Sequence, residues 1–210
     1  IFISDNGGCH ESTRSQAAFL NVKGETGTPD SFDAYEYPWA NVSNTPFRMY
    51  KHWVHEGGIA TPFIAFYPPL IKTRQINHLP AHIIDIMPTF LDLSGGKYPD
   101  RFNGQKIQPM EGNSLVPLFK GNKLKRNPPL FWEHEGNRAV RCGDWKLVSS
   151  YDSGKKEFLK WELYNLSEDR SELNDLRDKH PEKVAEMLRM YEKWAERTGV
   201  VSKEVIDRRK

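Results

Sequence analysis

Two neighbouring polar side chains near the start of the chain could bind a metal ion. Asp5 and Asn6 directly follow Ile1-Phe2-Ile3, an apolar run that predicts a buried β-strand. In an open α/β sheet, the residues that follow a strand lie at its carboxyl edge, where ligands bind. A carboxylate beside a carboxamide offers the hard oxygen ligands that Ca²⁺ and Mg²⁺ prefer. Taken alone, the stretch Asp-Asn-Gly-Gly also fits an ordinary turn, because each of its residues favours one.

A lysine that could act in catalysis, Lys51, lies five residues before Glu56-Gly57-Gly58. Near a metal ion its ammonium form is disfavoured by the like charge, so it could donate a proton to a leaving oxygen or hold an anion. The two glycines allow the backbone to approach other groups closely. Taken alone, a lysine before a loop is most often a solvated surface residue.

A third candidate is His134, which lies just after the start of the strand-like stretch LFWEHEG. Histidine titrates near neutral pH and suits contact with a sulfate group or a sugar. The same position also fits a structural histidine in a sheet turn. His134 is therefore a candidate substrate contact with a structural alternative.

The elements that must position these side chains predict an α/β protein with a smaller second part. The run 61–67 is short, apolar and closed by two prolines, as is typical of a strand buried on both faces. A helix is predicted to begin after Asp85, with Pro88 in its first turn, and to end at Gly95. The segment 27–50 has no clean period and reads as a long functional loop.

The chain is expected to divide at residues 121–129, a linker rich in Lys, Asn and Pro. Residues 1–120 then form the α/β part, and residues 130–210 form an α+β subdomain with an antiparallel sheet and a C-terminal amphipathic helix. That helix is predicted from Pro181 to Gly199, with an apolar stripe that packs in the core.

Composition narrows the classes of partner. The 210 residues carry a formal net charge of +2 with both signs interspersed, which predicts no nucleic-acid partner. No apolar run approaches the ~20 residues of a membrane span. The two cysteines are too few for a disulfide framework.

Several motifs, taken together and in order, resemble the C-terminal half of a type I sulfatase, of the arylsulfatase family in the alkaline-phosphatase superfamily. The stretches GTPDSF and WANVSNTPFR are most similar to a bacterial arylsulfatase subgroup. The motifs that carry the resemblance cover nearly the whole chain: SDNGG, RMYKHWVHEGGIATPFI, HIIDIMPTFLDLSGG, EGNSLVPLF, NRAVRCGDWKLV and WELYNLSEDRSELNDL.

The resemblance implies a fold and a set of roles. Residues 1–120 would be the C-terminal part of an alkaline-phosphatase-like core of sheet and helices. Asp5 and Asn6 match the second pair of Ca²⁺ ligands, and Lys51 matches the lysine that contacts the sulfate and assists the leaving group. The substrate would be a sulfated small molecule or glycan, and the protein would lie outside the cytoplasm, in the periplasm, a lysosome or the medium.

The sequence departs from the family at the nucleophile. In the family, a cysteine of a C-x-P/A-x-R motif becomes formylglycine, but neither Cys9 nor Cys142 stands in that pattern. The nucleophile and the first pair of metal-binding aspartates are therefore expected on an N-terminal half, the partner of this chain. We interpret the chain as a fragment that is inactive alone.

Two other functions stay open. A phosphoester or phosphonate hydrolase of the same superfamily would share the scaffold, because a fold does not fix a reaction. A non-catalytic subunit or binding module is the other alternative. The identity of the missing nucleophile separates the first alternative from a sulfatase, and stability without a partner distinguishes the second.

Overall fold

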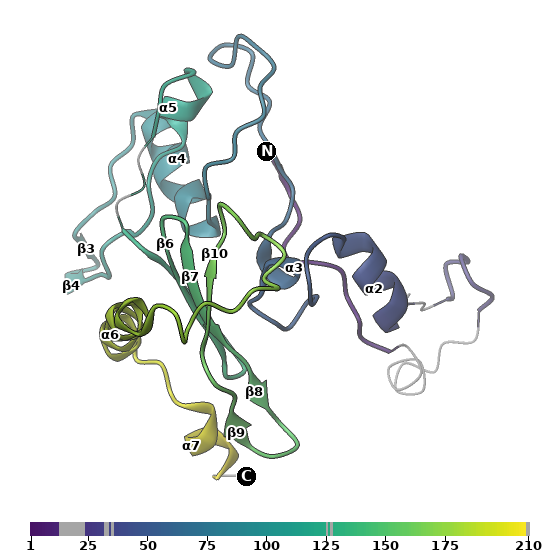
Figure 1. The fold of residues 1–210 in the computed structure, drawn as a ribbon. Helices are drawn as coiled ribbons and strands as arrows, with labels where there is room; N and C mark the ends of the chain where they lie inside the picture. The colour runs from purple at the N-terminus through teal and green to yellow at the C-terminus, as the bar shows by residue number, and fades with distance from the viewer. Residues whose placement is uncertain (13–23, 32–33, 35, 125, 127, 209–210) are drawn as a thin grey trace. The chain divides into compact units, whose positions relative to one another are not determined.

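A computed structural model describes residues 1–12, 24–31, 34, 36–124, 126 and 128–208 (Figure 1). Contacts divide the chain into two compact units. Unit 1 comprises Ile1 and Ala65–Leu130, and unit 2 comprises Phe2–Ile64 and Phe131–Lys210. Contacts thus group residues 2–64 with the C-terminal sheet, whereas the sequence analysis placed them with residues 65–120. The domain division at 121–129 itself stays a prediction.

Unit 2 is built on a four-stranded sheet in the order β10-β7-β6-β5, in which β7 pairs antiparallel with both β6 and β10. In the register, Val140 of β6 lies opposite Leu147 of β7, which in turn lies opposite Leu163 of β10. Gly143, with φ +61°, makes the turn between β6 and β7. The predicted antiparallel sheet is confirmed, with strands β5 (Leu130–His134), β6 (Asn137–Cys142), β7 (Trp145–Ser149) and β10 (Glu162–Asn165).

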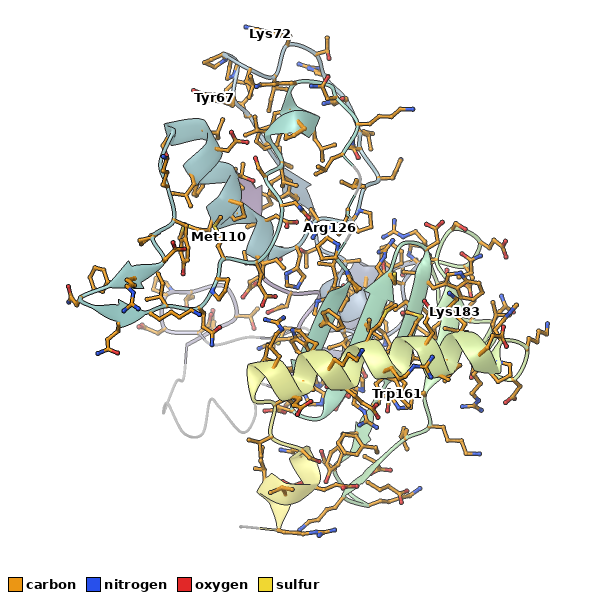
Figure 2. The ribbon with its side chains drawn as sticks, turned by 90° about the vertical axis from the view of Figure 1, so that its left-hand side faces the viewer. Tyr67, Lys72, Met110, Arg126, Trp161 and Lys183 are labelled. Atoms are coloured by element: carbon orange, nitrogen blue, oxygen red, sulfur yellow. The ribbon has the colours of Figure 1, made fainter. Side chains whose placement is uncertain are left out.

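The long helix α6 (Pro181–Thr198) lies across this sheet (Figure 2). It begins at Pro181, whose missing N–H costs nothing in the first turn, and ends at Gly199 in the left-handed conformation. Its apolar stripe packs on the sheet, so the predicted core role is confirmed. The stripe consists of Val184, Met187, Leu188, Tyr191 and Trp194, and the buried sheet residues below it are Val140, Leu147 and Leu163.

The remaining elements of unit 2 are short. Helix α2 occupies Glu36–Asn44, inside the segment that the sequence analysis interpreted as a loop, and α3 occupies Glu56–Ile59. Strands β8 (Tyr151–Asp152) and β9 (Glu157–Phe158) form a hairpin. Helix α7 (Lys203–Asp207) contacts that hairpin through Tyr151, whose hydroxyl donates to Asp207 at 3.0 Å.

The first strand differs from its prediction. β1 (Phe2–Ile3) pairs antiparallel with β2 (Phe63–Ile64), and the two form a two-stranded sheet rather than part of an open α/β sheet. Phe2 is 61% exposed and Ile64 is 58% exposed, so the predicted burial on both faces is wrong for this structure. An apolar run specifies that a strand can be buried, whereas the burial itself needs covering layers that the described residues do not supply.

Unit 1 carries a helical turn, two short helices and a small hairpin. The buried carboxylate of Asp85 organises it by accepting from the backbone N–H groups of His82 and Asn113, both at 2.8 Å, and by pairing with Arg126. Through its contact with His82, Asp85 closes a 3₁₀ turn that lies just before the predicted start of the helix. The elements are η1 (Ile83–Asp85), α4 (Ile86–Ser94, ended by Gly95 as predicted), β3 (Arg101–Phe102), β4 (Gln105–Lys106) and α5 (Val116–Phe119).

Candidate functional site

Glycine backbone brings the two predicted parts of the site together in unit 2. The N–H of Gly7 donates to the carbonyl of Gly58 at 3.0 Å, and the N–H of Lys51 donates to the carbonyl of Gly8 at 2.9 Å. A Cβ on Gly7 would lie 1.8 Å from the carbonyl oxygen of Gly57, so only glycine fits there. The turn that carries Asp5 is thus held against the segment that carries Lys51.

Because these approaches exclude side chains, Gly57→Ala is expected to lower the free energy of unfolding by about 1–3 kcal/mol. The added Cβ would lie 2.1 Å from the carbonyl oxygen of Met49 and 2.3 Å from that of Arg48. Urea unfolding measures the change. Gly154→Ala is the matched control, because its nearest contact would be 3.3 Å, and an equal loss of stability in both variants would contradict the account.

Lys51 lies among acidic groups. Its Nζ is 2.9 Å from Oε1 of Glu11, a partner that the sequence analysis did not identify. The hydrogen bond to Glu11 raises the pKa of Lys51, burial opposes it, and the charge of Asp5 adds to the increase. Lys51 therefore carries a proton at neutral pH, as an anion contact or proton donor requires.

The metal-binding candidates lie beside Lys51. Asp5 is exposed, and Asn6 is half-buried and uses Nδ2 to donate to the carbonyl of Gly7 at 2.6 Å. The carboxylate of Asp5 and Oδ1 of Asn6 are the hard oxygens that a calcium ion prefers. The donor set therefore fits Ca²⁺, although two side chains supply only part of its usual six to eight ligands.

His134 lies at the end of β5, next to the residue that follows Lys51. The rings of His134 and His52 are 5.6 Å apart, and Nδ1 of His52 is 3.2 Å from Oε2 of Glu135. Burial lowers the pKa of His52, while the charge of Glu135 opposes the shift. The predicted residues Asp5, Asn6, Lys51 and His134 thus belong to one unit, and His52 and Glu135 are additions that no spacing indicated.

An aromatic cluster lies beside the same loop. The ring of His10 is 4.6 Å from that of Tyr50 and 5.1 Å from that of Trp53, measured between centroids. Burial lowers the pKa of His10, which favours a neutral ring at pH 7. The cluster supports the turn after Lys51 from the side of the N-terminal segment.

The glutamate of the Glu56-Gly57-Gly58 motif has a structural role. Glu56 pairs with the buried Lys146 at 3.0 Å, and Lys146 also pairs with Glu172 at 2.8 Å. The backbone N–H of Glu56 donates to Oε2 of Glu172 at 2.7 Å. This buried cluster fixes the start of α3 and with it the glycines that hold the site.

A second polar network, around Glu162, predicts the response of the fold to acid. Burial raises the pKa of Glu162, but hydrogen bonds from His55 and Tyr164 and the charge of Arg48 outweigh it and hold the pKa at about 2. His55 lies 3.2 Å from Oε2 of Glu162, and the hydroxyl of Tyr164 donates to the same oxygen at 2.6 Å.

Because the pKa is lower in the folded state, the stabilisation is complete above the unfolded value near 4.5 and is lost as the pH falls towards 2. We expect the free energy of unfolding to decrease by on the order of 3 kcal/mol across that window. Urea unfolding between pH 2 and pH 6 measures it. Glu162→Gln should remove this part of the slope, and an unchanged slope in that variant would assign the acid response to other carboxylates.

The chain matches a protein-family model over residues 47–197, and the family is described as N-sulphoglucosamine sulphohydrolase, C-terminal. The match covers well over half of the chain. The fold and the loop that holds Lys51 are therefore those of a sulfatase C-terminal region, and the chain belongs to this family.

Two curated relatives agree with this placement, and one solved structure shares the fold. An uncharacterized sulfatase of Schizosaccharomyces pombe is 33% identical over 96% of this chain and 38% of its own length. The N-acetylgalactosamine-6-sulfatase of Mus musculus is 36% identical over 70% of this chain and 22% of its own length. A Bacteroides thetaiotaomicron structure, from work on the metabolism of multiple glycosaminoglycans, has a TM-score of 0.55 at 22% identity, covering 69% of this chain and 31% of that one.

These comparisons confirm the sulfatase resemblance and the α/β class, while the narrower assignment to a bacterial arylsulfatase subgroup stays a prediction. The chain spans less than two-fifths of the length of either curated relative. Among the described residues, the helices fall short of the length and apolarity that crossing a bilayer requires.

Proposed function

We propose that this chain is the C-terminal part of an enzyme that hydrolyses sulfate esters, and that it supplies Asp5, Asn6 and Lys51 to the active site. The observation that carries the proposal is the glycine-backed contact that joins the Asp5 turn to Lys51 in a chain of a sulfatase family. The sugar sulfatases named by the family and by the mouse relative favour a sulfated carbohydrate as substrate. An extracytoplasmic location belongs to the same proposal.

Each residue has a distinct role in this mechanism. The oxygens of Asp5 and Asn6 would hold Ca²⁺, which when bound neutralises charge on the sulfate. The ammonium group of Lys51, kept protonated by Glu11, donates a hydrogen bond or proton to the leaving oxygen as the ester bond breaks. His134, exposed at the end of β5, contacts the sulfate or the sugar.

A formylglycine nucleophile does not fit the cysteines of this chain. Cys9 and Cys142 are both partly buried free thiols, and neither stands in the C-x-P/A-x-R pattern. The nucleophile and the remaining calcium ligands are proposed to lie on the other part of the intact polypeptide. The longer sequences of the relatives and the exposed apolar side chains of Phe2 and Ile64 support such a partner part.

The proposal is tested with the intact polypeptide by comparing an aryl sulfate with the matching aryl phosphate. A sulfatase is expected to release sulfate much faster than phosphate. Faster phosphate release would favour the phosphoester hydrolase alternative. If neither ester is hydrolysed, and residues 1–210 alone form a monodisperse protein, the results would favour a non-catalytic binding module.

The calcium assignment predicts that Asp5→Ala weakens Ca²⁺ binding by more than about tenfold, because the ion loses its one carboxylate ligand from this chain. Equilibrium dialysis of the intact polypeptide measures the affinity. Raising the Ca²⁺ concentration should restore hydrolysis by Asp5→Ala as its metal site fills. Asp178→Ala is the control, because the Asp178 side chain is 94% exposed. Equal affinities in both variants would remove Asp5 from the metal site.

A further inference from the structure

Asn137, the first residue of β6, joins the two loops that carry the proposed site residues. Its side chain is fully buried, and Nδ2 lies 3.3 Å from the carbonyl oxygen of His52 and 3.2 Å from that of His134. The same Nδ2 lies 3.1 Å from Nε2 of the His52 ring. Oδ1 accepts from the backbone N–H of Tyr151 at 3.3 Å, which fixes the orientation of the amide.

The residue that Asn137 holds is strained. His52 has φ +96°, a backbone conformation that residues other than glycine rarely adopt. Such conformations persist only where surrounding contacts hold them, and they concentrate at functional sites. Here Asn137 contacts both the carbonyl and the ring of His52, and the strained residue directly follows Lys51.

The amide also decides which nitrogen of His52 carries the proton. Because Nδ2 faces two carbonyl oxygens, it is the donor end of the amide, and a proton on Nε2 of His52 would oppose its N–H groups. A proton on Nδ1 can instead be donated to Oε2 of Glu135 at 3.2 Å, so the contacts favour this tautomer.

This tautomer argues against a metal ion at the group His52, His134 and Glu135, whose ligand atoms lie within 4.8 Å of one another. Metal binding at Nδ1 would move the proton to Nε2, where it would face the N–H group of Asn137. The group is therefore better explained as a set of positioning contacts than as a metal site.

We infer that Asn137 is a positioning residue of the proposed sulfatase site, which clamps the strained His52 and thereby fixes Lys51 relative to His134. The inference rests on the proposed function, since Lys51 is the group that acts. A displaced Lys51 would meet the leaving oxygen poorly in the transition state while the substrate still binds.

The first test is Asn137→Asp in the intact polypeptide, which keeps the shape and removes the donor. We expect kcat for a sulfate ester to fall by about 10- to 100-fold while KM stays within about threefold. The new carboxylate would accept from Nε2 and raise the pKa of His52 above its wild-type value. Hydrogen–deuterium exchange at the imidazole C2, read by mass spectrometry, measures the pKa of His52. The other titratable groups that interact with His52 are Glu135, His134, His10 and Lys203.

The control for this test is Asn165→Asp. Oδ1 of Asn165 accepts from the N–H and hydroxyl of Ser167, and a carboxylate can keep both contacts. The control should keep the wild-type kcat and the wild-type pKa of His52.

His52→Gly is a second variant that keeps the inference testable if Asn137→Asp misfolds, because φ +96° costs glycine little. It should keep its unfolding temperature and still lose kcat, whereas a purely structural role would lower both together. A wild-type kcat in Asn137→Asp would overturn the inference, whether or not the pKa of His52 changes. An intact wild-type protein without sulfate release would instead overturn the proposed function.

Discussion

Lys51→Met in the intact polypeptide is expected to lower kcat for a sulfate ester by about 10²- to 10⁴-fold, the usual contribution of a positioned proton donor. Methionine keeps much of the length of the side chain and removes the charge. Glu11 would lose its 2.9 Å partner, but both side chains are partly exposed, so the fold should persist. Steady-state kinetics with the aryl sulfate measures the effect, and an unchanged unfolding temperature shows that the site rather than the fold was damaged.

The control for Lys51 is Lys72→Met in unit 1 (Figure 2). Lys72 is an exposed lysine whose Nζ contacts the carbonyl of Pro68 at 3.2 Å. The Lys72→Met variant should hydrolyse the ester at the wild-type rate. Equal rates in the two variants would show that Lys51 takes no part in the reaction.

The largest expected effect on stability is that of Lys146→Met, about 3–5 kcal/mol of lost unfolding free energy. Lys146 is fully buried between Glu56 and Glu172, at 3.0 Å and 2.8 Å, and its removal leaves two buried carboxylates without their shared cation. Arg170 still reaches Glu56 at 3.2 Å and compensates only in part, because it is half exposed. Urea unfolding of the wild type and the variant at pH 7 measures the difference.

Lys155→Met is the matched control for Lys146. Its side chain is 69% exposed and lies 3.9 Å from each of two carboxylates, so its loss should change the stability by less than about 0.5 kcal/mol. A loss below about 1 kcal/mol in Lys146→Met would mean that water or a rearranged side chain replaces the cation.

Local signals predicted the elements of this fold well where the signal lies within the element itself. The helix from Pro181 to Gly199 has a start residue, an apolar stripe and an end residue, and all three are found in α6. The antiparallel sheet predicted within residues 130–210 is likewise found, and its β6–β7 hairpin turns at Gly143.

The sequence misled where burial depends on neighbours. The apolar run at Phe2 predicted a covered strand, but coverage is a tertiary property, and β1 has only β2 beside it among the described residues. Helix α2 was missed because Pro38 and the flanking aromatic and Asn residues resemble loop composition.

The sequence predicted only part of the site, because the rest depends on contacts between residues far apart in the chain. Asp5, Asn6, Lys51 and His134 stand next to motifs, so short spacing could indicate them. Asn137 and His52 are 85 positions apart, and Glu11 and Lys51 are 40 apart, so only the folded chain brings them into contact. No periodicity encodes such pairs.

The most direct test of the account is sulfate release from an aryl sulfate, measured side by side for the intact polypeptide and for residues 1–210 alone, each with Ca²⁺. The account predicts turnover by the intact polypeptide and none by residues 1–210, because it places the nucleophile outside them. Turnover by residues 1–210 alone, or none by the intact polypeptide, would contradict it.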